Sequence, residues 1–372
     1  MPQTNLHPRT GLIDASGIRK VFDLAAQLED PINLSIGQPD FDTPEEVKAA
    51  AIKAIKDGKN SYTVTQGTGL MREAIQASLK TSRSVDYDLD QVLITSGVSG
   101  GLMLAFMSLF GEGDEVIVPD PYFVMYKHLL RLLGAKPVYA NIYPDFQLTA
   151  EIVEPLITEK TKAIITASPS NPTGAVMSSQ CWKELISLAD KRGLLIISDE
   201  IYDSFVYDEE FYSPATDYDN LLLLGGFSKS HAMTGWRLGY ATGPKDLISA
   251  MTMLQQFTFV CAPSMAQEAG LVALETSTDA KRIEYAAKRD KMVNALSDKY
   301  EINGAHGAFY LFPKVPTSES GTEFCTRAIN DQQLLMIPGC VFSETDTHFR
   351  ISYAASEEVL NRGVHALLEL AQ

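Results

Sequence analysis

Between residues 90 and 245 the chain alternates short apolar runs with amphipathic stretches, and this alternation constrains the fold most. Several runs are unbroken strings of valine, isoleucine and leucine. Strands covered by helices on both faces have this pattern, whereas a sheet with one exposed face alternates apolar and polar residues. We therefore predict an α/β fold around a mostly parallel seven-stranded sheet. The predicted strands lie in QVLIT, DEVIVP, KPVYANIY, KAIITAS, GLLIIS, LLLLGG and RLGYATG.

Helical patterns lie between these runs. In SSQCWKELISLADKRG, either Ser178 or Ser179 suits the first turn as a cap, and Gly193 suits the end of the helix. SMAQEAGLVALE and DAKRIEYAAKRDKMVNALSDKY predict two long helices farther along the chain. GAFYLFPKV and HFRISYA then predict a second, smaller sheet. We therefore expect the C-terminal part to form a domain of its own, and no Pro/Gly/Ser-rich linker separates it from the rest.

Charge, apolar run lengths and cysteine spacing exclude several classes of partner. The net charge is −16, which argues against a nucleic-acid backbone as ligand. No apolar run approaches the ~18 residues of a membrane span, and the N-terminus lacks a signal-peptide pattern. The four cysteines fit neither a disulfide framework nor a zinc site. We expect a cytoplasmic protein with reduced thiols, no metal site, and no nucleic-acid or membrane partner.

Polar residues follow four of the predicted strands. Ligands of open α/β sheets bind at the carboxyl ends of the strands, so these residues are expected to face one crevice. Each has an ordinary structural interpretation as well, such as a helix cap, a turn, a solvated lysine or a surface ion pair. Their expected co-location favours the functional interpretation. The residues are Ser99 in the turn SGVSGG, Asn171 in NPTG, Asp199 and Tyr202 in DEIY, and Lys229 and Arg237 in SKSHAMTGWRLGY.

Pyridoxal phosphate needs such a set of side chains. A lysine amine joins the cofactor covalently, and a carboxylate keeps the pyridine nitrogen protonated so that the ring can accept electrons. A phenol and an amide can bind the phenolic oxygen, while a helix N-terminus and an arginine hold the phosphate. An aromatic ring stacked on the cofactor completes the site. Tyr122 or Phe123 in PDPYFVMY suits that place, although core packing explains either residue equally well.

Six motifs together resemble the class I/II aminotransferases of the aspartate aminotransferase fold, pyridoxal phosphate fold type I, in their aspartate/aromatic branch. They are SIGQPDFDTP, YTVTQGTGLMREAI, SPSNPTGAV, ISDEIYDSFVYD, GFSKSHAMTGWRLGY and HFRISYA, which run in the family's order from Ser35 to Ala354. The resemblance implies a homodimer and a smaller domain built from both ends of the chain. Its expected segments are residues 1–45 and 276–372, with the large cofactor-binding domain at 46–275.

The resemblance also implies roles for individual residues in cofactor binding. Lys229 would form the Schiff base and move the proton during catalysis. Asp199 would pair with the pyridine nitrogen, and Tyr202 with Asn171 would bind the phenolic oxygen. The phosphate would be bound by the backbone of Val98 and Ser99, the Ser99 hydroxyl, Arg237, and Tyr62 from the neighbouring subunit. Phe123 takes the ring-stacking place, and Gly97 lets the start of the helix approach the cofactor.

Substrate binding follows from the same resemblance. Arg350 would bind the substrate α-carboxylate in a bidentate pair, helped by Gly37 and Asn171. Ser16, near the expected substrate entrance, is a candidate polar contact.

Two departures from the family pattern concern the phosphate and the side-chain pocket. Many members have a phosphate-binding serine where this chain has Gly226, while Ser228 stands just before the lysine. A lysine that helps one aspartate-handling subgroup is replaced by Ser99, and QQFTFVCAPSMAQ lacks the arginine of other aspartate-specific members. The donor amino acid, whether aspartate, aromatic or broad in range, stays open.

We therefore expect a ping-pong aminotransferase that passes an amino group from an L-amino acid to a 2-oxo acid, with 2-oxoglutarate as the expected acceptor. A C–S lyase, a decarboxylase or a synthase of the same fold is the alternative, since these reactions branch from one carbanion. A serine hydrolase is the alternative from another class, because GVSGG matches the G-x-S-x-G spacing and histidines follow Ser99. However, no HGGG-type oxyanion loop precedes the turn.

Overall fold

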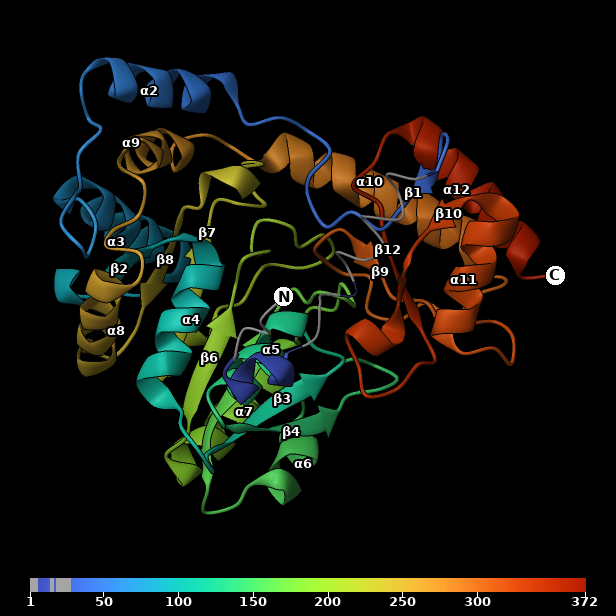
Figure 1. The fold of residues 1–372 in the computed structure, drawn as a ribbon, viewed down its shortest axis with the longest axis horizontal. Helices are drawn as coiled ribbons and strands as arrows, with labels where there is room; N and C mark the ends of the chain where they lie inside the picture. Colours follow the sequence, from blue (N-terminus) through green and yellow to red (C-terminus); the bar gives the residue numbers. More distant parts are fainter. Residues whose placement is uncertain (1–5, 14–16, 18–27) are drawn as a thin grey trace.

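The computed structural model describes residues 6–13, 17 and 28–372, and its centre is a seven-stranded sheet (Figure 1). All neighbouring strands are parallel except β8, which runs antiparallel to both β2 and β7. The α/β fold with a mostly parallel sheet is thereby confirmed, and each strand lies within its predicted segment or extends one residue beyond it. In spatial order the strands are β2 (Val92–Thr95), β8 (Gly239–Thr242), β7 (Leu221–Gly226), β6 (Leu195–Asp199), β5 (Thr161–Ala167), β3 (Glu115–Asp120) and β4 (Lys136–Asn141).

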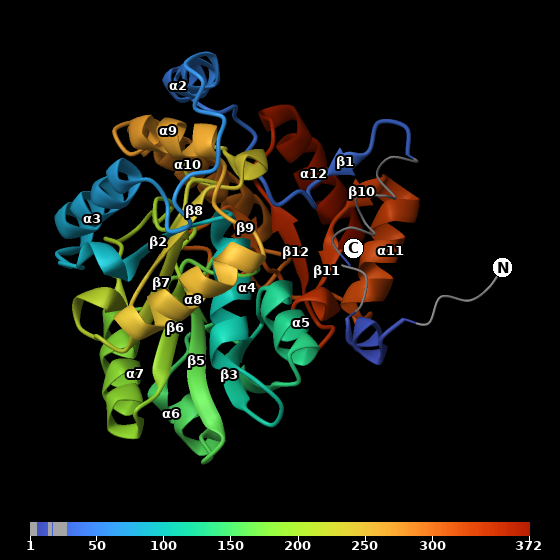
Figure 2. The same cartoon turned by 60° about the vertical axis from the view of Figure 1, so that its left-hand side comes forward.

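Helices cover both faces of this sheet (Figure 2), which explains the unbroken apolar runs. Ile196 and Ile197, successive residues of β6, are both fully buried in different apolar clusters. Ile196 packs in the cluster that contains residues of α3, α7 and α9, and Ile197 in the one that contains residues of α4, α5 and α8. The helices beside the large sheet are α2 (Glu45–Lys56), α3 (Gly69–Arg83), α4 (Gly97–Leu109), α5 (Val124–Leu132), α6 (Ala150–Val153), α7 (Ser179–Arg192), α8 (Lys245–Phe257) and α9 (Ser264–Ala273).

The helix ends follow the predicted signals where the sequence has clear ones. The Ser178 side chain accepts a hydrogen bond from the backbone N–H of Cys181, so Ser178 rather than Ser179 is the cap of α7. Gly193 ends this helix with φ of 64°, a left-handed conformation that glycine adopts without strain. The two long helices predicted farther along are α9 and α10 (Asp279–Leu296).

A smaller body packs beside the large sheet and joins the two ends of the chain (Figure 1). In it β12 (Phe349–Ser352) pairs antiparallel with β9 (Tyr310–Leu311) and β11 (Ile337–Pro338). From the N-terminal side, β1 (Ile32–Asn33) pairs in parallel with β10 (Leu334–Leu335). The helices of this part are α10, α11 (Gly321–Gln332) and α12 (Glu357–Leu370). The division at residues 45 and 275 stays a prediction.

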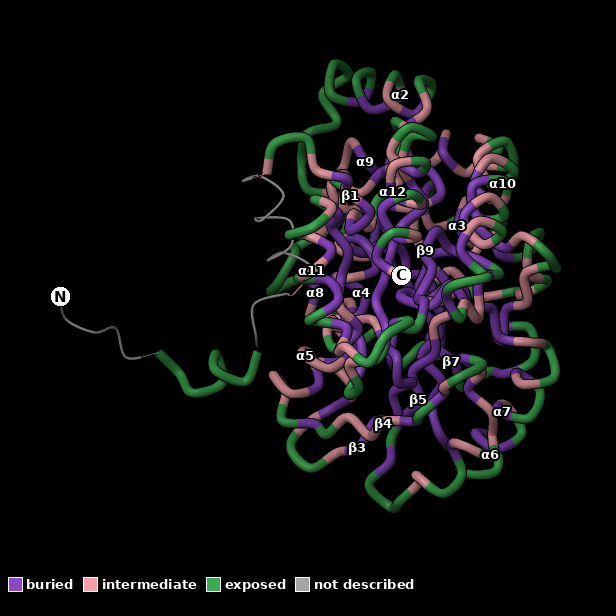
Figure 3. Tube along the Cα trace, turned by 90° about the vertical axis from the view of Figure 1, so that its right-hand side faces the viewer, coloured by how far each residue is buried: buried purple, intermediate pink, exposed green. Residues whose placement is uncertain are grey.

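Figure 3 shows that burial is concentrated in the strands, while loops and outward helix turns are exposed. The four cysteines form no disulfide. Within residues 6–13, 17 and 28–372, no helix has both the length and the apolar character needed to cross a membrane.

Candidate active site

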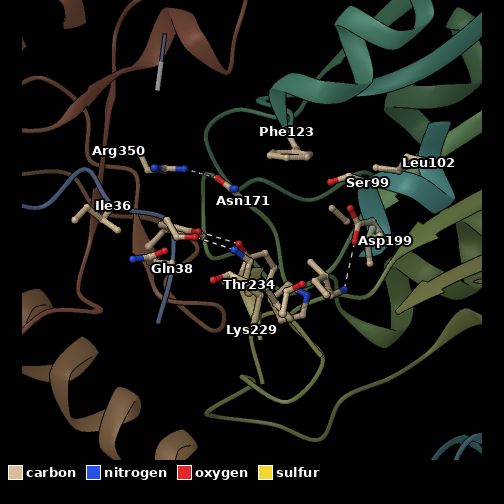
Figure 4. Close-up of a pocket in the computed structure, with 18 of the residues that line it drawn as sticks. Ile36, Gln38, Ser99, Leu102, Phe123, Asn171, Asp199, Lys229, Thr234 and Arg350 are labelled. Atoms are coloured by element: carbon tan, nitrogen blue, oxygen red, sulfur yellow. Dashed lines mark hydrogen bonds between the residues drawn. The ribbon is translucent and has the colours of Figure 1, made fainter. Parts of the chain in front are cut away.

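A cavity of about 330 Å³ lies at the carboxyl ends of β5, β6 and β7, beside the start of α4 (Figure 4). The polar residues predicted to meet there do so, because parallel strands end at one edge of the sheet. Residues from both ends of the chain close the cavity on the other side. The predicted site residues that line it are Gly37, Val98, Ser99, Phe123, Asn171, Asp199, Tyr202, Ser228, Lys229, Arg237 and Arg350.

Lys229 follows β7 and extends into the cavity, where its Nζ donates a hydrogen bond to the carbonyl oxygen of Gly37 at 2.7 Å. Burial and the positive charges of Arg350 and Arg237 lower the pKa of Lys229 from 10.5 to about 8, against the attraction of the Asp199 carboxylate. A substantial share of this amine is therefore neutral at mildly alkaline pH. A neutral buried amine is the form that attacks a carbonyl.

Asp199 is the last residue of β6 and is only 4% exposed. Its Oδ2 accepts a hydrogen bond from the Tyr126 hydroxyl at 2.8 Å, and its Oδ1 accepts one from the backbone N–H of Ile201 at 3.3 Å. Burial raises the pKa of Asp199 from 3.8 to about 6, although both hydrogen bonds and the Lys229 charge favour the ionised form. At neutral pH the cavity thus holds a buried carboxylate whose charge a cationic ring nitrogen would compensate.

The start of α4 and Arg237 form the anion-binding end of the cavity. The guanidinium of Arg237 donates to the carbonyl oxygen of Thr234 at 2.8 Å and lies against the turn before the helix. Gly97 has φ of +68°, and a Cβ there would stand 2.5 Å from Arg237 Nη2. Only glycine therefore lets the guanidinium approach so closely. The backbone N–H groups of the first helical turn, which have no partner within the helix, and this guanidinium suit a phosphate.

Arg350 is 1% exposed and lines the same cavity as Lys229. Its Nη1 donates to Asn171 Oδ1 at 3.0 Å, and its Nη2 donates to the carbonyl oxygen of Ser35 at 2.8 Å. The rings of Tyr310 and Phe342 lie 4.5 and 4.8 Å from its Cζ. Burial lowers the pKa of Arg350, yet arginine stays protonated in proteins. The guanidinium is thus a fixed cation for a small carboxylate.

Of the aromatic residues considered for the site, some line the cavity and one is buried in the core. Phe123 faces the cavity, whereas Tyr122 is buried away from it, with its ring stacked on Tyr139 at 5.3 Å. Tyr202 reaches the cavity from the segment after β6, and its hydroxyl lies 2.8 Å from that of Tyr310. Of the two rings considered for stacking, Phe123 is the one placed to do so.

Two of the predicted residues that the structure describes are not among those that line the cavity, namely Gly97 at the start of α4 and Tyr62. Tyr62 is 83% exposed and points to solvent. Ser16 lies outside the described residues.

Lack of space explains why residue 226 is glycine and not the serine that many family members have. Gly226 pairs with Gly239 across β7 and β8, and a Cβ at Gly226 would stand 3.0 Å from the Gly239 Cα. A serine at this place would press on the neighbouring strand. Ser228, which is present instead, lines the cavity.

Sequence reasoning missed two tyrosines of the site. Tyr126 stands one helical turn after Phe123, and this i, i+3 spacing places both on one side of α5, so periodicity is a signal that would have found it. Tyr310 stands in the apolar run GAFYLFPKV, which carries no signal of a site.

The arrangement does not favour hydrolysis by Ser99. Among the described residues that line the cavity none is a histidine, so Ser99 has no imidazole base beside it. Ser99 instead belongs to the first turn of α4, at the anion-binding end.

The donor set fits pyridoxal 5′-phosphate. The cavity supplies a buried amine, a buried carboxylate, a phenol, an anion-binding helix start with an arginine, and an aromatic ring. Three cationic side chains against one carboxylate give the cavity a positive balance, although the whole chain carries −16. A phosphate and a substrate carboxylate are the anions that such a balance accommodates.

Comparisons with known proteins agree with this reading. The model of the family "Aminotransferase class I and II" matches residues 29–367. A probable aspartate aminotransferase of Methanocaldococcus jannaschii is 39% identical, covering 96% of this chain and 97% of its own. Aromatic-amino-acid aminotransferase 2 of Thermococcus litoralis is 34% identical, covering 96% of each chain. The structure of aspartate aminotransferase from Thermus thermophilus with maleate superimposes with a TM-score of 0.95 at 32% identity, covering 99% of this chain and 100% of that one.

The raised pKa of Asp199 predicts that this carboxylate destabilises the cofactor-free protein at neutral pH. Because the pKa of Asp199 in the folded protein, about 6, lies above the ordinary aspartate pKa of 3.8, the folded protein keeps this proton to a higher pH than the unfolded chain. Stability therefore falls as pH rises through this window, by about 3 kcal/mol in total. Asp199→Asn, whose amide oxygen still accepts from Tyr126, should raise the melting temperature of the apoprotein at pH 8 and raise it less at pH 5.

Asp145→Asn is the matched control, since Asp145 is exposed. Its melting temperature should follow that of the wild type at both pH values. An Asp199→Asn variant that melts no higher than the wild type at pH 8 would contradict the electrostatic account of this carboxyl group.

Proposed function

The chain belongs to the class I and II aminotransferases, which use pyridoxal phosphate, and from this premise we propose its reaction. It exchanges the amino group of an L-amino acid, aspartate, aromatic or of broader range, with a 2-oxo acid, 2-oxoglutarate being the proposed acceptor. The observation that carries the proposal is the cavity itself, where a buried amine with a lowered pKa, a buried carboxylate and a buried arginine meet.

The residues that hold the cofactor follow from their chemistry. When bound, pyridoxal phosphate supplies an aldehyde that joins an amine and a ring that draws electrons from the substrate α-carbon. Asp199 would pair with the ring nitrogen, with its charge held in place by the Tyr126 hydroxyl. Tyr202 and Asn171 would bind the phenolic oxygen, while Phe123 covers the ring. The phosphate would lie at the start of α4, against Val98, Ser99, Ser228 and Arg237.

Substrate orientation and proton movement are assigned to two basic side chains, Arg350 and Lys229. Arg350 would bind the α-carboxylate with Gly37 and Asn171, and its two ring neighbours and two hydrogen bonds keep its plane fixed. Lys229 Nζ, neutral in part because of its lowered pKa, would take the proton from the substrate α-carbon. Since one arginine would bind the carboxylate of both the amino acid and the 2-oxo acid, the two substrates would use the cavity in turn. This is the ping-pong order.

We also propose that the protein acts as a homodimer in which Tyr62 reaches the partner's phosphate site. Tyr62 and Phe257, 83% and 84% exposed, are large apolar side chains for which a partner surface is the natural cover. Their segments adjoin, because Gln255 on α8 donates to the carbonyl oxygen of Thr65 at 2.6 Å. The cytoplasmic location indicated by the cysteines stays a prediction.

A donor series tests the reaction. Aspartate, phenylalanine, tyrosine, alanine and methionine are each offered with 2-oxoglutarate, and glutamate is measured. We expect glutamate from at least one donor and parallel lines in double-reciprocal plots. Arg350→Lys keeps the charge but loses the bidentate pair, so it should raise KM for donor and acceptor by about tenfold or more. Arg282→Lys on α10, where the side chain is partly exposed and pairs with Asp279, is the control. Ammonia and pyruvate from cystathionine, without glutamate from any donor, would replace transamination by the lyase.

Mixing two site variants, Lys229→Ala and Tyr62→Ala, tests the shared site. In Lys229→Ala homodimers every site lacks the amine, and in Tyr62→Ala homodimers every site has a weakened phosphate contact. A mixed dimer contains one site with both residues if Tyr62 acts across the interface. Refolding the variants together should therefore restore tight cofactor retention in a fraction of sites. A mixture no better than the Tyr62→Ala protein alone would refute the cross-subunit role.

A further inference from the structure

Tyr310 lines the cavity, and it contacts two groups to which a role has been assigned. It lies on β9, in the smaller sheet, and is fully buried. Its hydroxyl is 2.8 Å from the Tyr202 hydroxyl, and its ring lies 4.5 Å from the Arg350 Cζ. A single side chain thus contacts the phenol assigned to the cofactor and the guanidinium assigned to the substrate.

The direction of the hydrogen bond follows from counting hydrogens. Either tyrosine can be the donor in the pair as it stands. A phenol has one hydrogen, so once Tyr202 gives its hydrogen to the phenolic oxygen of the cofactor, it can only accept from Tyr310. Burial raises the pKa of both phenols, so both keep their hydrogens at neutral pH. Tyr310 is then the donor, and the Tyr202 hydrogen points at the cofactor.

The surroundings leave the Tyr310 side chain little freedom. A Cβ on Gly37 would stand 3.0 Å from its hydroxyl oxygen, so the backbone of the N-terminal segment confines that oxygen on one side. On the other side lies Tyr202, and the two rings meet edge to face at 5.7 Å between centroids. The ring also packs against the Arg350 guanidinium, as the ring of Phe342 does. Both the hydroxyl and the ring are therefore fixed in place.

We propose that Tyr310 is a positioning residue with two separate contributions. Its hydroxyl fixes the Tyr202 hydroxyl as a donor to the cofactor's phenolic oxygen, and its ring holds the Arg350 guanidinium in the plane that receives the substrate carboxylate. The proposal rests on the proposed function, since it needs Tyr202 at the cofactor and Arg350 at the substrate. It adds a physical link between the two ends of the cavity through one side chain.

The hydroxyl contribution is tested on the holoenzyme by an absorbance titration. The nitrogen that joins Lys229 to the cofactor changes the absorbance when it loses its proton. A hydrogen-bond donor to the phenolic oxygen stabilises the negative charge on that oxygen. The oxygen then attracts the proton on the nitrogen less strongly, and the pKa of the nitrogen is lower. Tyr310→Phe should therefore raise the pKa of this transition, by roughly half a unit to one unit for one hydrogen bond. Tyr202→Phe should raise it further, and adding Tyr310→Phe to Tyr202→Phe should change nothing more.

Tyr353→Phe is the matched control. Tyr353 is also fully buried in the same apolar cluster, but its hydroxyl donates to the Ala308 carbonyl oxygen at 3.2 Å. In Tyr353→Phe the pKa of the absorbance transition should equal that of the wild type. A shift in Tyr202→Phe with none in Tyr310→Phe overturns this inference alone. No shift in Tyr202→Phe removes Tyr202 from the cofactor, and the inference falls with that part of the proposed function.

The ring contribution is tested by comparing Tyr310→Phe with Tyr310→Leu. Binding of maleate and of 3-phenylpropionate to the holoenzyme is followed by absorbance. Both probes carry a carboxylate for Arg350 but differ in the rest of the molecule, so together they report on Arg350 whether the natural amino-acid donor is acidic or aromatic. Phenylalanine keeps the ring, so affinity for both probes should stay near that of the wild type. Leucine removes the ring and should weaken both on the order of tenfold, as expected for a buried cation–π contact. Equal affinities in the two variants would overturn the ring's role.

Discussion

Desolvation of the Lys229 amino group is the constraint on which the rest of the site depends. Burial and two neighbouring guanidinium groups bring the pKa of this amine to about 8, and only the Asp199 carboxylate opposes them. The cavity keeps a positive balance because Arg350 and Arg237 stay charged in place, one held by Asn171 and Ser35 and the other by Thr234. An anionic cofactor and an anionic substrate would complete this balance, which explains how a chain of net charge −16 can contain a site for both.

The fold supplies this site by bringing distant segments to one edge of the sheet. β2, β5, β6 and β7 end on the same side, so the turn at Ser99, the amide of Asn171, the carboxyl of Asp199 and Lys229 meet without further bending of the chain. Two glycines allow the close approach that the anion-binding end needs. Gly97 leaves room for the Arg237 guanidinium, and a Cβ on Gly239 would stand 2.8 Å from the Gly97 carbonyl carbon.

Much of this was predictable, and the exceptions have physical reasons. Unbroken apolar runs identify strands buried on both faces, and the position after each run identifies the functional edge, so the sheet and the strand-end residues followed from the sequence. Tyr310 did not, because it enters the cavity through packing of the smaller sheet, and strand periodicity cannot say which tertiary neighbour a buried tyrosine meets. The reason for a glycine at position 226 could not be predicted either, since it lies in the pairing of β7 with β8, which places Gly226 beside Gly239. The partner surface proposed around Tyr62 would need a second chain, whose position the sequence alone cannot predict.

The central claim is that Lys229 is the amine that binds pyridoxal phosphate in this cavity. An absorbance titration of the apoprotein with pyridoxal phosphate tests it most directly, with Lys229→Ala beside the wild type and Lys183→Ala, on α7, as the control. The account predicts a saturable absorbance band of lysine-bound cofactor in the wild type and in Lys183→Ala, resistant to gel filtration, and its absence in Lys229→Ala. The same band, with the same midpoint, in Lys229→Ala would contradict the account.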